Sequence, residues 1–164
     1  ASPSPSGETY ILFVQDVFSR FVYTEALFDK SPRVVIAAFK QILNKAGVVV
    51  PKIVMSDGAA EFRRLFQDML TSSGIMYEKR EEDPRAMSTM DSAIGRFKRA
   101  LARIMRKQQT NDWAGRLQKV THGQHIVHNE SYLEGSEPKD VDGVLLVLSF
   151  NTDMSFPIIT GIKH

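Results

Sequence analysis

The chain has 164 residues, 43% hydrophobic and 24% charged, which fits one globular domain with a core of ordinary size. It contains no cysteine, which excludes disulfides, thiolate zinc sites and cysteine nucleophiles. The formal net charge is only +2, and because no hydrophobic run reaches the roughly 18 residues of a membrane span, we expect no membrane partner.

The N-terminal part is predicted to hold a lead-in and two strands. Serine, proline and glycine dominate residues 1–8, which we expect to be flexible. Because the chain starts with Ala1 and not with methionine, it is expected to be a fragment or a processed product. Aromatic and β-branched residues then predict strands at 10–16 and 21–28, joined by a turn at 17–20.

Helices and short strands alternate after this hairpin. Ser31 and Pro32 favour a helix start, because serine suits the N-cap and proline the first helical position, and Gly47 is the expected stop. The hydrophobic periods then predict a strand at 52–55, a helix at 62–70 and a strand at 75–77.

A polar stretch at 79–85 is predicted to be a loop, followed by a long helix from Ser88 to about Gln108 and another helix from near Asn111. The order ββαβαβαα predicts a mixed α/β fold with a small central sheet. Residues 143–164 are hydrophobic without a clear helical period, and a strand there is one of the open alternatives.

Six basic residues gather in the long helix with no acid between them: Arg96, Lys98, Arg99, Arg103, Arg106 and Lys107. Such a stripe suits a polyanion. A solvated helix face is the alternative, because basic surface stripes also occur in proteins that bind no polyanion.

Four segments carry a resemblance to a known family. They are YILFVQDVFSR (10–20), SDGAAEF (56–62), MDSAIGRFKRAL (90–101), and the C-terminal pair of His128-Asn129 with GSEPKDV (135–141). In order and spacing they resemble the catalytic core of DDE-type integrases, the DNA-joining enzymes of retroelements and some DNA transposons.

This resemblance implies an RNase H-like mixed sheet with flanking helices over residues 9–142, and a C-terminal tail of open structure at 143–164. It also implies metal-dependent DNA cleavage and strand transfer, with Mg²⁺ or Mn²⁺ as cofactor, DNA as partner, and self-association as a homo-oligomer. Such a reaction uses two divalent ions about 4 Å apart, and hard ions of this kind want oxygen ligands.

The resemblance points to Asp57 and Asp91 as catalytic and metal-binding residues. Asp57 stands at a strand end before a helix, where its alternative role is to cap that helix. Ser88 and Asp91 also fit a capping box, in which the acid only binds backbone donors. A rival alignment puts Gly95 at the position of the family's last acid, and glycine cannot bind a metal.

The family's first acid lies on a strand before the D-x-F-S-R strand, whereas here only nine residues, ASPSPSGET, precede Tyr10. We therefore expect the first strand to be missing and the chain to be inactive as it stands. Asp16 matches a turn position that is not a family ligand, and Glu8 beside Gly7 is a weaker candidate still.

Three hypotheses follow. In the first, Asp57 and Asp91 belong to a polynucleotidyl transferase whose third acid comes from the missing strand. In the second, the chain is a catalytically dead remnant that binds nucleic acid non-specifically. In the third, it is an interaction module, because a missing strand would leave a sheet edge open. In the first two hypotheses, the side chains that bind nucleic acid would be Lys98, Arg99, Arg103 and Arg106.

Overall fold

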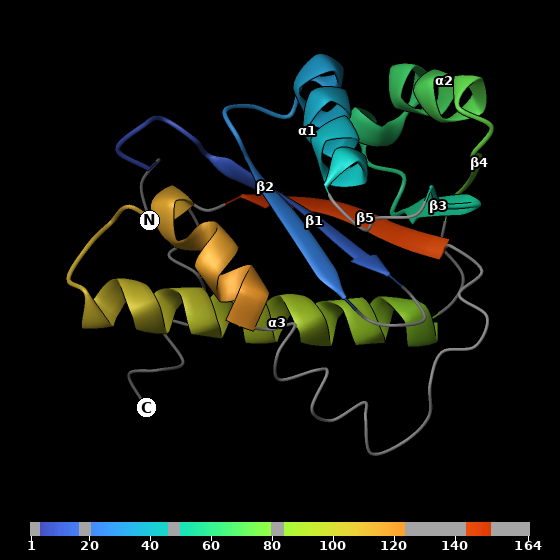
Figure 1. The fold of residues 1–164 in the computed structure, drawn as a ribbon. Coiled ribbons are helices and arrows are strands. Elements are labelled where there is room, and N and C mark those ends of the chain that lie inside the picture. The colour runs from blue at the N-terminus through green and yellow to red at the C-terminus, as the bar shows by residue number, and fades with distance from the viewer. Residues whose placement is uncertain (1–3, 17–20, 46–49, 80–83, 124–143, 152–164) are drawn as a thin grey trace.

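The structure is a computed structural model that describes residues 4–16, 21–45, 50–79, 84–123 and 144–151. A five-stranded mixed sheet lies between two helical layers, with α1 and α2 over one face and α3 under the other (Figure 1). The predicted mixed α/β fold is therefore confirmed. The strands are β1 (Tyr10–Asp16), β2 (Val22–Leu27), β3 (Ile53–Ser56), β4 (Met76–Lys79) and β5 (Val144–Asn151).

The helices are α1 (Pro32–Asn44), α2 (Arg64–Ser72) and α3 (Pro84–Lys107), with short 3-10 turns η1 (Ala60–Phe62) and η2 (Ala114–Arg116). Residues 117–123 are also helical. No helix in the described ranges is both long enough and hydrophobic enough to cross a membrane. Each predicted helix and strand up to residue 123 therefore has a counterpart, although several boundaries differ.

The sheet order is β2-β1-β5-β3-β4, so the C-terminal strand lies in the middle. β5 runs antiparallel to β1, where Tyr10 is opposite Asn151, and parallel to β3, where Ser56 is opposite Val147. The tail is therefore a strand over 144–151, and it fills the gap between the hairpin and the β3-β4 pair. The edges of β1 and β3 that face each other are thus covered, and the outer edges of the described sheet belong to β2 and β4.

β1 is buried on both faces, and its alternating side chains divide the core in two. Ile11 and Phe13 belong to the cluster on the α3 side, whereas Leu12 and Val14 belong to the cluster under α1 and α2. Phe13 meets the Phe97 ring of α3 edge to face, with ring centroids 5.7 Å apart. These contacts fix α3 against the sheet and so determine where its polar faces point.

The long helix begins earlier than predicted, at Pro84 and not at Ser88. Proline suits the first helical turn because its missing N–H is one that no helix start can satisfy. Ser88 and Asp91 therefore lie inside α3, and the capping-box interpretation of Asp91 is wrong. Of the predicted loop at 79–85, Lys79 belongs to β4 and Pro84 and Arg85 belong to α3, whereas residues 80–83 lie outside the described ranges.

Candidate functional site

A tight turn follows β3 and carries the S-D-G motif. The Ser56 hydroxyl accepts a hydrogen bond from the Gly58 backbone N–H at 3.1 Å and lies 2.5 Å from the Tyr77 hydroxyl of β4. Gly58 has φ +77°, a conformation that glycine adopts without strain. Ser56 is buried, so these bonds hold the turn from below and leave Asp57 at its exposed tip.

Asp57 organises its own turn and does not cap a helix. Its Oδ1 accepts a hydrogen bond from the Ala59 backbone N–H at 3.0 Å, which is an Asx turn. The N-cap residues of η1 and α2 are Ala59 and Arg63, and neither helix has a side-chain cap bond. The alternative role of Asp57 as an N-cap is therefore wrong, and its exposed carboxylate retains oxygen lone pairs that could bind a metal ion.

Asp91 is exposed in the second turn of α3. Ala93 and Ile94, the residues that follow, pack in the same core cluster as Met55 of β3. Asp57 stands one residue beyond the end of β3 and two positions beyond Met55. The first half of α3 therefore packs against the strand that leads into the turn of Asp57.

Asp16 stands at a different level of the sheet. It is opposite Leu145, whereas Asp57 follows the residue opposite Val147. The two acids are therefore about three residues apart along the strands and two strands apart across the sheet, which is roughly 10 Å in each direction. This offset separates Asp16 from Asp57, and the predicted turn at 17–20 lies outside the described ranges.

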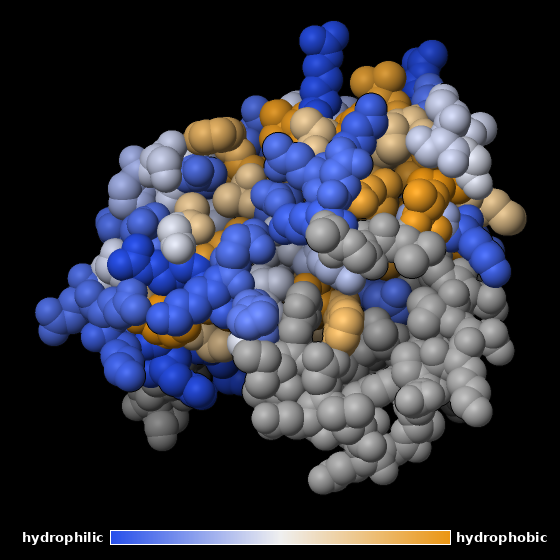
Figure 2. Space-filling view, viewed as in Figure 1, coloured by the Kyte–Doolittle hydropathy of each residue, from blue (hydrophilic) through white to orange (hydrophobic). Residues whose placement is uncertain are grey.

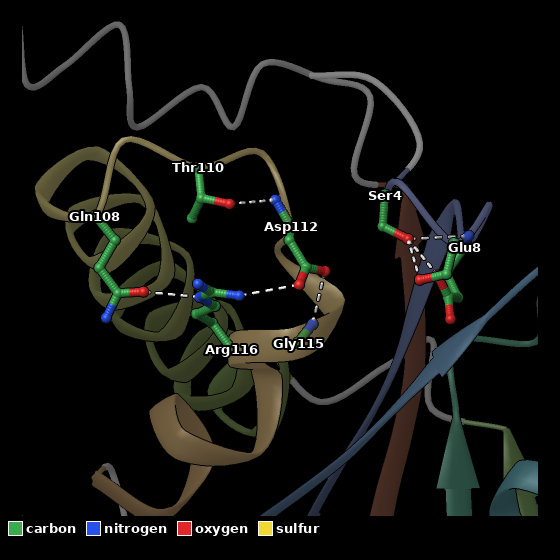
Figure 3. A network of polar contacts seen from close by, with 8 residues as sticks. Ser4, Glu8, Gln108, Thr110, Asp112, Gly115 and Arg116 are labelled. Carbon is green, nitrogen blue, oxygen red and sulfur yellow. Dashed lines mark hydrogen bonds and ion pairs between the residues drawn. The ribbon is translucent and has the colours of Figure 1, made fainter.

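Glu8 is held by the N-terminal turn. The Ser4 hydroxyl donates a hydrogen bond to its carboxylate, and the Glu8 backbone N–H donates to that same hydroxyl at 3.2 Å (Figure 3). The hydrogen bond from Ser4 lowers the pKa of the Glu8 carboxyl below its ordinary value. Local bonding therefore explains this acid without a metal.

The sequence analysis assigned no role to Glu61, the second acid of the SDGAAEF motif. Glu61, within SDGAAEF, is buried at 6% exposure, and its Oε1 lies 4.0 Å from Lys30 Nζ at the start of the α1 layer. A signal was present in the sequence, because Glu61 directly precedes the aromatic residue Phe62 in the SDGAAEF motif. Glu61 therefore links the segment after β3 to Lys30, and its buried carboxylate is not exposed to bind an ion from solvent.

The acids do not complete a metal site by themselves. Across the described ranges, no three His, Asp or Glu side chains are grouped so that they could hold a metal ion. Asp57 and Asp91 offer the hard oxygen ligands that Mg²⁺ and Mn²⁺ prefer. A two-ion site needs more ligands than these two carboxylates, so the described residues do not fit the implied cofactor.

The predicted nucleic-acid-binding residues divide into two kinds. Arg99, Arg103 and Arg106 are exposed on α3. Lys98 is half-buried, and burial lowers the pKa of its ammonium below the ordinary value. It lies seven residues after Asp91, hence on nearly the same line of the helix surface. Lys98 therefore belongs with the candidate acid and not with the exposed arginines.

Comparison with protein families gives no match, and neither does comparison with curated proteins. Solved structures do match. The magnesium complex of the HTLV-2 integrase catalytic core domain in its dimeric form has TM-score 0.57 and 21% identity, covering 68% of this chain and 72% of that one. The trimeric form of the same domain has TM-score 0.58 and 20% identity, covering 74% of this chain and 77% of that one. The BIV integrase catalytic core domain has TM-score 0.62 and 14% identity, covering 81% of this chain and 92% of that one. The chain therefore has the RNase H-like fold of retroviral integrase catalytic cores, and the predicted resemblance is confirmed at the level of the fold.

Proposed function

We propose that this chain, built on the fold of integrase catalytic cores, derives from an enzyme for metal-dependent DNA cleavage and strand transfer and is inactive as it stands. Asp57 and Asp91 are two of its metal ligands, and a third acid is missing. The magnesium complex of the HTLV-2 core domain supports the choice of ion. The observation that carries the proposal is the position of β5 beside Asp57.

A strand placed before β1 and joined to it by a short turn would pair with β1 along one of its two edges. β2 covers one edge and β5 covers the other. An acid-bearing strand that reached Asp57 would need the second edge, between β1 and β3, where β5 now lies. The eight residues of β5, VLLVLSFN, contain no acid. A carboxylate is therefore lacking at the position where a third ligand would be required.

The isolated chain is expected to give no strand transfer on a labelled DNA end with Mg²⁺ or Mn²⁺, because two carboxylates bind a pair of metal ions weakly. The assay compares the unaltered chain with Asp57→Asn, and both should leave the DNA unjoined. Metal-dependent joining that Asp57→Asn abolishes would contradict the proposal and return Asp16 or Glu8 to the site.

A second arm restores the acid. Val147 is opposite Ser56, so Val147→Asp and Leu148→Asp place a carboxylate at the two positions level with Ser56 and Asp57. Neighbouring strand positions face opposite sides of a sheet, so each variant controls for the other. We expect Mn²⁺ binding, followed by electron paramagnetic resonance, to rise in one variant alone and to fall again on adding Asp57→Asn. Equal binding by both variants would place the metal site elsewhere.

Non-catalytic binding of nucleic acid is a second candidate function, favoured by the exposed basic side chains of α3. Of the four predicted residues, the exposed Arg99, Arg103 and Arg106 would contact phosphates, whereas Lys98 is half-buried beside them. Such contacts give salt-sensitive binding without sequence preference. DNA binding in the absence of divalent ions, together with no joining in their presence, would favour this function for the chain. The homo-oligomer implied by the resemblance remains a proposal, to be tested by the mass in solution.

A further inference from the structure

Asp57 and Gly58 form the one Asp-Gly pair in the described ranges, and this pair has a chemistry of its own. Because glycine has no Cβ to obstruct the approach, its main-chain nitrogen can attack Cγ of the preceding aspartate. An N–Cγ bond closes a five-membered succinimide, the nitrogen loses its hydrogen and Cγ loses a hydroxyl group, so one water leaves. Water then opens the ring at either carbonyl, which returns aspartate or gives isoaspartate, in which the main chain runs through the former side-chain carbon.

The turn after β3 leaves the carboxyl of Asp57 accessible but occupies the nitrogen that would attack it. Asp57 is exposed and Gly58 is buried, and the Gly58 N–H donates a hydrogen bond to Ser56 Oγ at 3.1 Å. Because the nitrogen must lose this hydrogen, the bond has to break before the ring can close. Ser56 Oγ is itself held 2.5 Å from the Tyr77 hydroxyl, and Ser56 is only 3% exposed, so the acceptor stays in place beside the nitrogen.

Two further hydrogen bonds hold Asp57 and Gly58 in their native positions. The Ala59 N–H donates to Asp57 Oδ1 at 3.0 Å, and Arg63 Nε donates to the Gly58 carbonyl at 3.2 Å. Ring closure needs Cγ of Asp57 to move to bonding distance of the Gly58 nitrogen, and these bonds oppose that movement. Arg63 is the N-cap of α2, and Tyr77 lies on β4. Over these two elements, at the upper right of Figure 2, hydrophilic side chains reach the surface beside hydrophobic ones.

We propose that Asp57-Gly58 is a latent modification site, at which the hydroxyl pair of Ser56 and Tyr77 suppresses the formation of isoaspartate in the folded chain. The two hydroxyls come from neighbouring parallel strands, with Val54 of β3 opposite Tyr77 of β4. The protection therefore exists only while β3 and β4 are paired. Isoaspartate would lengthen the main chain and shorten the side chain by one carbon each, which would displace the carboxylate of Asp57. The protection itself does not depend on metal binding.

The test is the rate at which isoaspartate forms at neutral pH. Trypsin cuts after Lys52 and Arg63 and so releases residues 53–63, whose aspartate and isoaspartate forms are separated by chromatography against synthetic standards. The folded chain should react more slowly than the chain unfolded in urea. Ser56→Ala should raise the rate in the folded chain by about three- to tenfold, the factor that one ordinary hydrogen bond contributes. Tyr77→Phe should raise it by a smaller factor.

The matched control is Thr121→Val, which removes one hydroxyl from another buried pair. Thr121 and Thr24 have their Oγ1 atoms 2.6 Å apart, and Thr24 lies on β2, at the opposite edge of the sheet from β4. This variant should react like the unaltered chain, and circular dichroism shows whether each variant is folded during the incubation. An unchanged rate in folded Ser56→Ala, or an equal rise in Thr121→Val, would overturn the proposal.

If Ser56→Ala does not fold, Tyr77→Phe decides the question, because it keeps the ring and removes only the hydroxyl. An unchanged rate in that variant would overturn the proposal, and so would a folded chain that reacts as fast as the chain in urea. None of these results bears on metal binding or on strand transfer, so the proposed function is tested separately.

Discussion

Gly58 shapes the turn that presents Asp57, through both its backbone and the space beside it. Its φ is +77°, and a Cβ built there would lie 2.3 Å from Lys79 Cε and 3.0 Å from Lys79 Cγ. Gly58→Ala should cost about 1–2 kcal/mol for the left-handed backbone, plus the cost of moving the lysine. Gly74→Ala is the matched control, because its φ is +74° with nothing within 4 Å of the added Cβ.

Urea denaturation of the two variants should therefore show the larger loss of unfolding free energy for Gly58→Ala. Combining it with Lys79→Ala, and correcting for Lys79→Ala alone, should bring the loss down to that of Gly74→Ala. Equal losses for both glycine variants would mean that Lys79 moves aside at no cost and that the backbone alone explains the glycine.

At the scale of the elements, α3 carries a glycine that its fold does not require. Gly95 has helical backbone, and an added Cβ would meet Arg99 Nη1 at 3.5 Å, an ordinary contact. Gly95→Ala should therefore stabilise the protein by about 0.5–1 kcal/mol and raise the melting temperature by a few degrees. Thermal denaturation followed by circular dichroism measures this.

Gly115→Ala is the control for that substitution, because the added Cβ would lie 2.4 Å from Asp112 Oδ2 and disturb the hydrogen bond that Asp112 Oδ1 accepts from the Gly115 N–H. That variant should melt at a lower temperature. A loss of stability in Gly95→Ala would show that the rival alignment marks a position where α3 tolerates no side chain, and an acid there would then be excluded on steric grounds.

Local signals predicted the elements better than their ends. Ser31 and Pro32 predicted the start of α1, and the structure confirms it. The N-cap residue and the proline of the first turn both indicate the same start. For α3 the sequence predicted a start at Ser88, and Pro84, where the helix begins, was assigned to the polar loop. The late predicted start is what made a capping box at Ser88 and Asp91 an alternative to metal binding by Asp91.

At the scale of the whole molecule, the place of β5 could not be predicted. Its sequence VLLVLSFN is a continuous hydrophobic run, as in strands buried on both faces. Nothing in that run identifies its partners, because strand pairing is decided by residues more than 90 positions away, such as Asn151 opposite Tyr10. Motifs in the sequence pointed to Asp57 and Asp91 as candidate metal ligands. Which residues lie beside them depends on how β5 pairs with β1 and β3, which local sequence does not reveal.

A disulfide would test the pairing of β5 with β3. Val54 and Leu145 are opposite each other in the parallel pair and are both buried in the same core cluster. With no native cysteine in the chain, Val54→Cys with Leu145→Cys should close one intramolecular disulfide on oxidation and raise the urea midpoint. Mass spectrometry and non-reducing gels would detect it.

Leu27→Cys with Val54→Cys is the control, because two strands separate β2 from β3 and the Cα atoms are then too far apart for a bond. A covalent dimer from the Val54 and Leu145 pair would show that β5 is donated by another copy of the chain. Free thiols in both variants would mean that β5 lies elsewhere.

The central position of β5 also sets the order in which the protein can mature during synthesis. Residues 144–151 leave the ribosome after the four other strands that the structure describes, yet they close the sheet between β1 and β3. Until then the nascent hairpin and the β3-β4 pair each carry an unpaired inner strand edge, a template for aggregation. At about 5–20 residues per second this interval lasts several seconds, so slower translation of the codons between β4 and β5 would lengthen the time in which a chaperone is needed.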